Sequence, residues 1–292
     1  MQKTAVILIA GRPNTGKSTL LNRLVGSKVA IVSPKPQTTR SRITGVYTEG
    51  ELQLVFLDTP GLHRARSKLG DRMVRAITDS ASSADLAILM CEPDKGPGAP
   101  ERALCQRFAE AHLPAICVIN KADTVQKSTL LPVMQAYAEA HPFEAIVPIS
   151  AREGDGVEEL LSVLSGMARE GEHIFPDDEM TDQTERTLAA EYLREQFLRH
   201  LEREVPHGIA VVAERFEERE DGVIEVDLTV YCEKQSHKGI IIGAHGENLK
   251  AAGAAARKNL EELLGAKVFM QIWVRVKEDW KNNDYLLASF GL

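Results

Sequence analysis

Short apolar runs and longer amphipathic stretches alternate along the first part of the chain, from Thr4 to about Arg169. The apolar runs predict strands at 4–10, 43–48, 52–58, 86–91, 115–120 and 146–149. The stretches between them carry apolar residues at helical spacing and predict helices near 17–25, 71–82, 100–111, 128–140 and 157–169. Strands that alternate with helices predict an α/β domain of three layers, in which helices cover both faces of a mostly parallel sheet.

The second part of the chain has a different order of elements. The pattern predicts a helix over 189–197, strands over 209–216 and 223–231, an apolar run at 240–242, a helix over 249–264 and a strand over 268–276. A turn with the pattern G-x-x-G, residues 243–246, lies between the last two helices. The order α-β-β-α-α-β with this turn matches a type II KH module, a small α+β domain whose turn clamps a nucleotide backbone.

An acidic stretch separates the two parts. From Glu170 to Glu185, both included, there are seven acidic residues, no Lys or Arg, and a proline at position 176. Such a charge run is typical of a solvated connector. We therefore expect one domain over 1–172, a connector over 173–184 and a second domain over 185–292.

The composition restricts the classes of function. The net charge is −7, so any nucleic-acid site must be local. The four cysteines show no C-x-x-C spacing, and Cys91 and Cys117 lie in apolar runs where buried thiols are expected. This usage favours reduced thiols that bind no metal, in an intracellular protein. The apolar run after Lys3 is too short for a signal peptide, and no segment approaches the ~20 apolar residues of a membrane span. We expect a soluble protein, with peripheral membrane attachment left open.

Residues 11–18, GRPNTGKS, fit the phosphate-binding pattern G-x-x-x-x-G-K-[ST] between a predicted strand and a predicted helix. Glycines let the main chain wrap around a polyphosphate, and the amide groups of a helix N-terminus favour its negative charge. Lys17 should reach the β- and γ-phosphates, and the Ser18 hydroxyl should bind Mg²⁺. The residues expected to contact the nucleotide here are Gly11, Arg12, Pro13, Asn14, Thr15, Gly16, Lys17 and Ser18.

The next candidate motif, Asp58, Thr59, Pro60 and Gly61, follows a predicted strand. Asp58 is placed to hold Mg²⁺ through a water, and the Gly61 amide to sense the γ-phosphate. The loop before residue 43 contains two prolines and two adjacent threonines. One threonine would complete the Mg²⁺ shell only when the γ-phosphate is present, which would order the loop. We favour Thr39 over Thr38 for this role, and the choice stays open at this point.

The base of the bound nucleotide is predicted to be guanine from three residues at the end of the strand at 115–120. They are Asn120, Lys121 and Asp123. The Asp123 carboxylate can accept from the ring N–H and the exocyclic amine of guanine, whereas adenine offers neither donor on that edge. Such a site discriminates by roughly 10⁴ or more. Ser150 and Ala151 follow the next strand, and the Ala151 N–H is expected to reach the guanine oxygen.

Four motifs in order, GRPNTGKSTLLN, PKPQTTR, DTPGLH and NKAD, resemble the Era branch of bacterial translation-associated GTPases. The resemblance continues through the second part and covers essentially the whole chain. It implies a GTPase domain that uses GTP, GDP and Mg²⁺, joined to an RNA-binding KH domain that helps to assemble the small ribosomal subunit. The RNA partner implied is small-subunit ribosomal RNA near its 3′ end.

Two residues bear on hydrolysis. Leu62 stands where many regulatory GTPases have a glutamine that orients the attacking water, and leucine cannot replace it. Asn14 matches an asparagine that ligates potassium beside the phosphates in related GTPases, although asparagine is also favoured in turns. We expect slow intrinsic hydrolysis, activated by a monovalent cation or a partner, with Lys17, Thr39 and Asn14 as the catalytic set.

The expected RNA contacts lie around the second glycine motif. Ala244 and His245 separate its glycines, so the motif lacks the Lys or Arg often found there. The residues expected to meet RNA are Lys238, Gly243, Ala244, His245, Gly246, Lys250 and Arg257.

Two other classes of function compete with an RNA-binding GTPase. A nucleoside kinase would share the phosphate loop but needs an arginine-rich lid, and here the strand ends carry guanine and Mg²⁺ contacts instead. A membrane-associated signalling GTPase would bind protein or lipid through its C-terminal domain, yet the sequence shows no lipidation motif or polybasic run. The leading expectation is a monomeric cytoplasmic GTPase, with attachment to the inner face of the cell membrane as the alternative.

Overall fold

The computed structural model describes residues 1–61 and 67–292, and these form two compact units. Among the described residues, the first unit contains 1–30, 39–61 and 70–182. The second contains 183–292 together with two short segments from the first half of the chain, 31–38 and 67–69. Residues 173–182 of the predicted connector therefore belong to the first unit.

A twisted sheet forms the centre of the first unit, with the strand order β2-β3-β1-β4-β5-β6. Its strands are β1 (Lys3–Gly11), β2 (Ile43–Glu49), β3 (Leu52–Asp58), β4 (Leu86–Cys91), β5 (Ala115–Ile119) and β6 (Ala145–Pro148). A short strand, β7 (Arg169–Glu170), pairs with β1. All pairings are parallel except those of β2 and β7, so the prediction of a mostly parallel sheet is confirmed.

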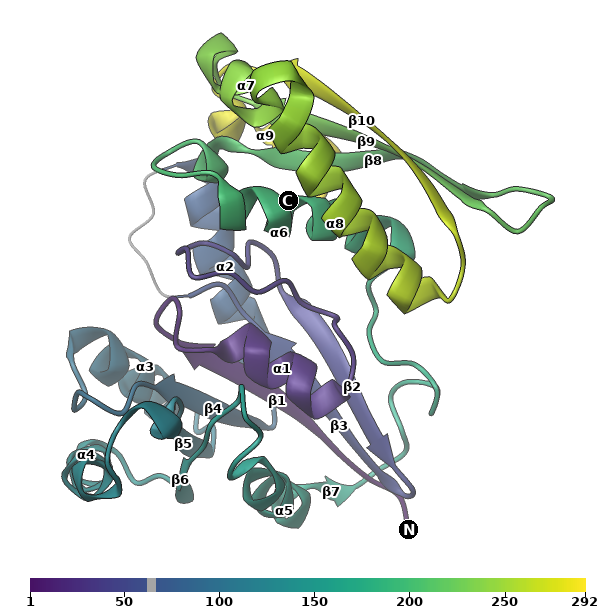
Figure 1. Cartoon of the computed structure of the whole chain (residues 1–292). Coiled ribbons are helices and arrows are strands. Elements are labelled where there is room, and N and C mark those ends of the chain that lie inside the picture. The colour runs from purple at the N-terminus through teal and green to yellow at the C-terminus, as the bar shows by residue number, and fades with distance from the viewer. Residues whose placement is uncertain (62–66) are drawn as a thin grey trace. The chain divides into compact units, whose positions relative to one another are not determined.

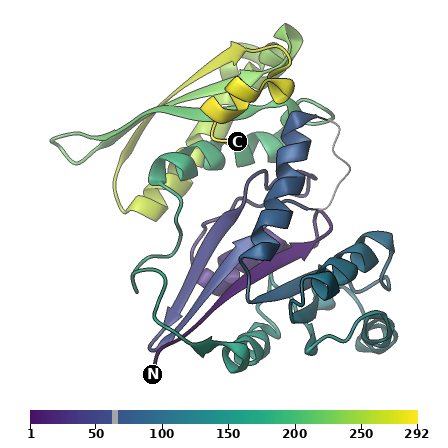
Figure 2. The same cartoon turned by 180° about the vertical axis from the view of Figure 1, so that it is seen from behind.

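Helices cover both faces of this sheet, as Figures 1 and 2 show from opposite sides. They are α1 (Lys17–Val25), α2 (Lys68–Ser82), α3 (Ala99–Glu110), α4 (Lys127–Ala140) and α5 (Val157–Met167). Leu20 of α1 and Leu160 of α5 belong to the core on one face, while Phe108 of α3 and Tyr137 of α4 belong to the core on the other. Since the central strands are buried on both faces, they are apolar throughout rather than alternating.

The acidic stretch is bonded to the first unit rather than free in solvent. Gln53 of β3 accepts from the backbone N–H of Ile174 at 2.7 Å and donates to the carbonyl of Phe175 at 2.9 Å. The Val46 N–H donates to the Met180 carbonyl at 2.9 Å, and the Thr44 hydroxyl to Asp182 at 2.8 Å. Charge composition does not reveal these contacts, and the acidic side chains of the stretch are exposed or half-buried.

The second unit is a three-stranded sheet with helices packed against it. The strands β8 (Ala210–Glu218), β9 (Ile224–Cys232) and β10 (Val268–Val276) lie in the order β10-β9-β8. The helices are α6 (Glu185–His200), α7 (Gln235–Ile242), α8 (Glu247–Leu264) and α9 (Asp284–Ser289). The predicted order α-β-β-α-α-β is confirmed, with α9 as an addition too short to give a periodic signal.

The core of the second unit joins α6 and α8 to the sheet. Leu193 and Phe197 of α6 pack in one cluster with Ala256 and Leu260 of α8 and with Leu228 of β9. The cysteines Cys91, Cys105, Cys117 and Cys232 are free and buried. Within residues 1–61 and 67–292, no helix is both long enough and apolar enough to cross a membrane.

Candidate functional site

The loop between β1 and α1 has a backbone conformation that depends on glycine. Gly16 has φ +96°, and a Cβ added there would lie 2.1 Å from Nδ2 of Asn120. Asn14 has φ +65° and is exposed, a left-handed conformation that asparagine tolerates better than most residues. The loop therefore brings its main chain close to Asn120, which directly follows β5.

Lys17 lies buried beneath this loop. Its Nζ donates to the carbonyl of Arg12 at 2.8 Å and lies 3.3 Å from that of Gly11. Burial lowers the pKa of Lys17 to about 8, and the nearby Asp58 carboxylate opposes this shift. The protein thus holds an ammonium group at a cost in desolvation, and a bound polyphosphate would restore the stability of its charged form.

Three side-chain oxygens from separate elements meet beside Lys17. The Ser18 hydroxyl donates to Oδ2 of Asp58 at 2.6 Å and lies 3.1 Å from the Thr39 hydroxyl, which itself lies 3.5 Å from the same carboxylate oxygen. Burial raises the pKa of Asp58, opposed chiefly by Lys17. The other oxygen, Oδ1, is buried and has no hydrogen-bond partner among the described residues.

These oxygens suit a small divalent cation. Hydroxyl and carboxylate oxygens are the ligands that Mg²⁺ prefers, and an ion of this charge would stabilise the buried carboxylate in its ionised form. The orphaned Oδ1 is the observation that fits such an ion or its water shell. Thr38 does not share this site, since its hydroxyl contacts that of Ser33 at 2.8 Å and donates to the Lys35 carbonyl at 2.7 Å.

The residues after Asp58 pack against the part of the site where the phosphates are expected. The Thr59 hydroxyl donates to the Ile9 carbonyl at 3.0 Å, and Pro60 is buried. Gly61 lies against the phosphate loop, where an added Cβ would come within 2.7 Å of the Pro13 nitrogen. Leu62 lies outside the described residues.

Asn120 forms hydrogen bonds both to the phosphate loop and to the part of the site where the nucleotide base is expected. Its Nδ2 donates to the carbonyl of Thr15 at 2.8 Å, and its Oδ1 accepts from the backbone N–H of Ala151 at 2.9 Å. The Ala151 N–H is thus bonded to protein rather than directed freely at a base, which differs from the expectation for this amide. The reason is that Asn120 is buried, so its side-chain oxygen needs a hydrogen-bond donor from the protein.

Asp123 is the carboxylate that remains accessible at this end. Its side chain is 23% exposed, and the nearest cation is Arg152 at 3.9 Å. Lys121 has a left-handed backbone and pairs with Glu92 at 2.5 Å. Ser150 is buried and its hydroxyl accepts from the Glu153 N–H at 3.2 Å, which shapes the loop after β6.

Arg12 reveals a contact that sequence reasoning missed. Its guanidinium pairs with both carboxylate oxygens of Glu101, which is only 5% exposed and also accepts from the Gly98 N–H at 3.0 Å. The Arg12 side chain therefore braces the phosphate loop against α3, and only its carbonyl faces Lys17 and Thr15. A partner 89 residues away leaves no signal in local spacing.

The geometry of the second unit supplies a separate groove. Gly243 and Gly246 have φ of +76° and +81°, and a Cβ on Gly243 would lie 2.8 Å from Asn248, whose amide donates to the Ile240 carbonyl. A hollow of about 400 Å³ runs from this turn along α8 and β10. It is lined by Gly246, Leu249, Lys250, Gly253, Ala254, Arg257, Met270 and Ile272.

The groove combines an apolar floor with two basic side chains, Lys250 and Arg257. Gly253 permits close approach of β10, since a Cβ there would lie 2.7 Å from Ile272 Cδ1. Three of the predicted RNA residues therefore come together here, whereas Lys238 on α7 is not part of the lining. Met270 and Ile272 were not predicted because strand alternation alone does not show which face is grooved.

Two family models match the chain. Residues 6–121 match that of the 50S ribosome-binding GTPases, and residues 204–281 match that of the KH domain. Their limits fall within the two units found in the structure.

Relatives match over nearly the whole length. The chain is 44% identical to GTPase Era of Ruminiclostridium cellulolyticum over 289 residues, 99% of this chain and 97% of the relative. It is 46% identical to GTPase Era of Geotalea uraniireducens, with the same coverage. A crystal structure of Era with MgGDPNP and nucleotides 1506–1542 of 16S ribosomal RNA matches at a TM-score of 0.95 and 36% identity, covering 100% of this chain and 99% of that one.

Gly16→Ala is expected to weaken nucleotide binding at least tenfold, because the added methyl would displace the Asn120 amide and leave buried polar groups unpaired, at roughly 1–3 kcal/mol. Gly26→Ala is the matched control, since Gly26 also has a positive φ, +76°, but a Cβ there meets nothing within 4 Å. Titration with a fluorescent GDP analogue measures both. Equal affinities would show that the Gly16–Asn120 contact does not support the site.

Proposed function

Because this chain belongs to the GTPase Era family, we propose that it is a GTP-hydrolysing switch that binds small-subunit ribosomal RNA and assists assembly of the small ribosomal subunit. The observation that carries the nucleotide half is the meeting of Ser18, Thr39 and Asp58 beside the buried Lys17. A hydroxyl from the loop before β2 joins one from α1 only when that loop is ordered. This is the arrangement in which a γ-phosphate can be sensed.

In the proposed site, Ser18, Thr39 and Asp58 hold Mg²⁺, directly or through water. The ion neutralises charge on the β- and γ-phosphates, and Lys17 donates to their oxygens. The backbone amides of residues 11–18 and of Gly61 complete the contacts to the phosphates. The matching Era structure contains MgGDPNP, and another, from Aquifex aeolicus at 36% identity and a TM-score of 0.95, was solved with GDP.AlF4-.

Guanine is selected by Asp123 in this proposal. Asn120 and Ser150 shape the pocket from beneath, and Lys121 stands at its edge with its ammonium group on Glu92. The partly exposed Asp123 carboxylate is then the acceptor for the two guanine donors. Sharing of the Ala151 N–H between Asn120 and the guanine oxygen would add a third contact.

Hydrolysis is proposed to be slow without an activating monovalent cation or partner. Asn14 lies exposed in the phosphate loop, and in this proposal its side-chain oxygen ligates a potassium ion next to the phosphates. Such an ion would supply positive charge where the transition state develops negative charge. The catalytic set in this proposal is Lys17, Thr39 and Asn14.

RNA is proposed to bind in the groove of the second unit. Gly243 and Gly246 leave room for a sugar-phosphate chain, with Ala244 and His245 between them, and Lys250 and Arg257 stand beside it. The apolar floor suits unstacked bases of a single strand. The 16S ribosomal RNA segment bound to the matching Era structure supports a partner near the 3′ end of small-subunit RNA.

We place the protein in the cytoplasm as a monomer. A net charge of −7 gives no general attraction to anionic lipid, and no membrane-spanning helix occurs in the described parts of the chain. Peripheral attachment to the inner face of the cell membrane is the alternative. Sedimentation with anionic liposomes, with and without RNA, separates the two.

The proposal is tested by titrating fluorescent RNA from the 3′ end of small-subunit RNA against the protein bound to a GTP analogue or to GDP. We expect tighter binding in the GTP-analogue state. Replacing Lys250 and Arg257 by Ala is expected to weaken binding and to lower its salt dependence, since two phosphate contacts are lost. Lys258→Ala is the control, because this residue is exposed on the same helix but does not line the groove. Absence of binding in both states would overturn the RNA assignment.

Hydrolysis is expected to run faster in potassium than in sodium buffer at equal ionic strength. Asn14→Gly should abolish the difference, since glycine keeps the left-handed backbone but removes the ligand oxygen. Measuring phosphate release for both proteins in both salts separates a potassium ligand from a turn residue. Equal wild-type rates in the two salts would refute the potassium site.

Asp123→Asn is expected to lower GTP affinity by roughly 10²-fold or more and to raise affinity for XTP, because an amide can donate to the xanthine carbonyl that replaces the guanine amine. Asp123→Ala should lower the affinity for GTP without raising the affinity for XTP. Competition of GTP, XTP and ATP against a fluorescent nucleotide measures the order of preference. Retention of GTP selectivity in Asp123→Asn would show that another group reads the base.

A further inference from the structure

The loop between α1 and β2 contains a segment, residues 31–38, that belongs to the second unit. Ile31 is 1% exposed and packs in the core cluster that contains Tyr192, Leu193 and Phe197 of α6. Just before it, Ala30 is held by Asn22 of α1 through hydrogen bonds of 2.7 and 2.8 Å. Just after it, Thr39 returns to the first unit. Both ends of the segment are thus fixed to the first unit.

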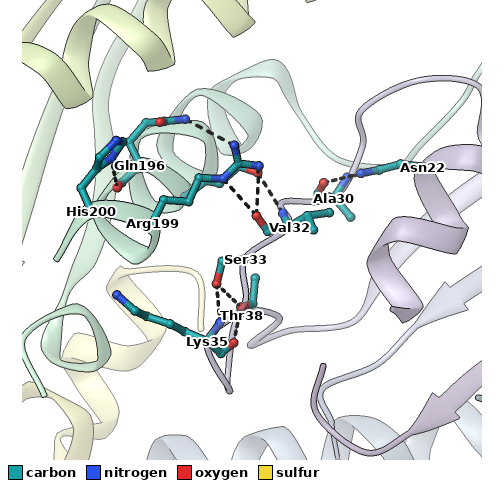
Figure 3. A network of polar contacts seen from close by, with 10 residues as sticks. Asn22, Ala30, Val32, Ser33, Lys35, Thr38, Gln196, Arg199 and His200 are labelled. Atoms are coloured by element: carbon teal, nitrogen blue, oxygen red, sulfur yellow. Dashed lines mark hydrogen bonds and ion pairs between the residues drawn. The ribbon is translucent and has the colours of Figure 1, made fainter. Parts of the chain in front are cut away.

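An ion pair on α6 satisfies both backbone groups of Val32. Glu195, whose side chain is fully buried, accepts from the Val32 N–H at 2.9 Å and pairs with Arg199 at 3.0 Å. Arg199 donates to the Val32 carbonyl from Nη2 at 3.2 Å and from Nε at 3.3 Å. Figure 3 shows the guanidinium of Arg199 directed at this carbonyl. Hydrogen bonds to charged groups are about twice as strong as neutral ones, so this contact is well suited to hold a loop.

Two further side chains extend the contact along the segment. Arg194, itself only 2% exposed, donates to the carbonyl of Thr38 and pairs with Glu191 at 2.6 Å. Lys35 donates to the Leu201 carbonyl just beyond the end of α6. Within the segment, the hydroxyls of Ser33 and Thr38 contact each other (Figure 3). The segment has no regular secondary structure, so these bonds rather than a helix or sheet ladder determine its course.

The last bonded group of the segment is one peptide away from the candidate metal ligand. Arg194 binds the Thr38 carbonyl, and this carbonyl belongs to the peptide that joins Thr38 to Thr39. Consecutive Cα atoms are only about 3.8 Å apart, so fixing this peptide restricts where the Thr39 hydroxyl can lie. The observed position of that hydroxyl is 3.1 Å from Ser18.

From this geometry we propose that Glu195 and Arg199 of α6 are positioning residues for GTP hydrolysis. They hold Val32, and through the segment 31–38 they favour the loop conformation in which Thr39 meets Mg²⁺. The inference rests on the function proposed above. By linkage, a triphosphate that orders Thr39 also strengthens the hold of the segment on α6, and loss of the α6 contacts weakens triphosphate binding.

Arg199→Ala tests the inference, because Arg199 is about half exposed and its loss should leave the fold intact. We expect affinity for a GTP analogue to fall at least fivefold relative to affinity for GDP, which does not use Thr39. Hydrolysis should need several-fold more Mg²⁺, a shift that general loss of stability would not produce. An unchanged ratio of GTP-analogue to GDP affinity, together with an unchanged Mg²⁺ requirement, would overturn the proposal.

Glu195→Gln keeps an oxygen for the Val32 N–H but loses the charge that orients Arg199, so its effect should be smaller than that of Glu195→Ala. Glu185→Gln, the same change in the exposed first turn of α6, is the matched control and should leave both readouts unchanged. The double variant Thr39→Ala with Arg199→Ala should be no worse than Thr39→Ala alone, because both act on one ligand. Additive effects would contradict action through Thr39.

Measurements on the wild-type protein separate failure of the proposed function from failure of the positioning role. A wild-type protein that does not bind guanine nucleotides would refute the proposed function itself. A wild-type protein that hydrolyses GTP, with Arg199→Ala equal to it in every readout, would refute only the positioning role.

Discussion

The buried pair of Lys17 and Asp58 is the constraint on which the site depends. Placing an ammonium and a carboxylate away from water costs free energy, and the shifted pKa values of both groups reflect that cost. The pairing of β1 with β3 places Asp58 opposite Ile9, and the loop that follows β1 leads to Lys17 at the start of α1. The site is therefore prepared for a ligand that brings both phosphate and a cation, and binding either alone would leave one charge poorly compensated.

Other contacts fix the rim around this pair. Asn120 bonds the phosphate loop to the turn after β6 and so links the two ends of the site. Arg12 and Glu101 brace the same loop from α3. The loop before β2 differs in that its middle is bonded to α6 through ion-paired side chains. The middle of this loop therefore belongs to the same unit as α6.

Much of the first unit could be predicted from sequence because its signals are local. Apolar runs gave the strands β3 and β4 at their observed limits, and the phosphate loop is a contiguous motif. The choice of Thr39 over Thr38 required coordinates, since adjacent threonines differ only in the direction of their hydroxyls. The Arg12–Glu101 pair and the contacts of α6 with Val32 join residues 89 and 163 positions apart, a separation at which pattern carries no information.

The two tryptophans of the second unit also show that local pattern does not predict which side chains are buried. Trp280 is buried and its indole donates to the Gly208 carbonyl at 3.0 Å, whereas Trp273 is 41% exposed on β10. Alternation along β10 fixes which residues share a face, but only the neighbours of the strand decide which face is covered.

Ile31 lies in the core around α6, and this affects any fragment made by cutting the chain between the two units. A fragment cut before Gln183 would keep the helices α6 to α9 and the strands β8 to β10 yet lack this side chain, leaving a void among Tyr192, Leu193 and Phe197. Voids of this kind typically lower stability by a few kcal/mol. Part of the core of the second unit therefore comes from a residue that precedes β2 in the chain, and a cut at the apparent sequence boundary would remove it.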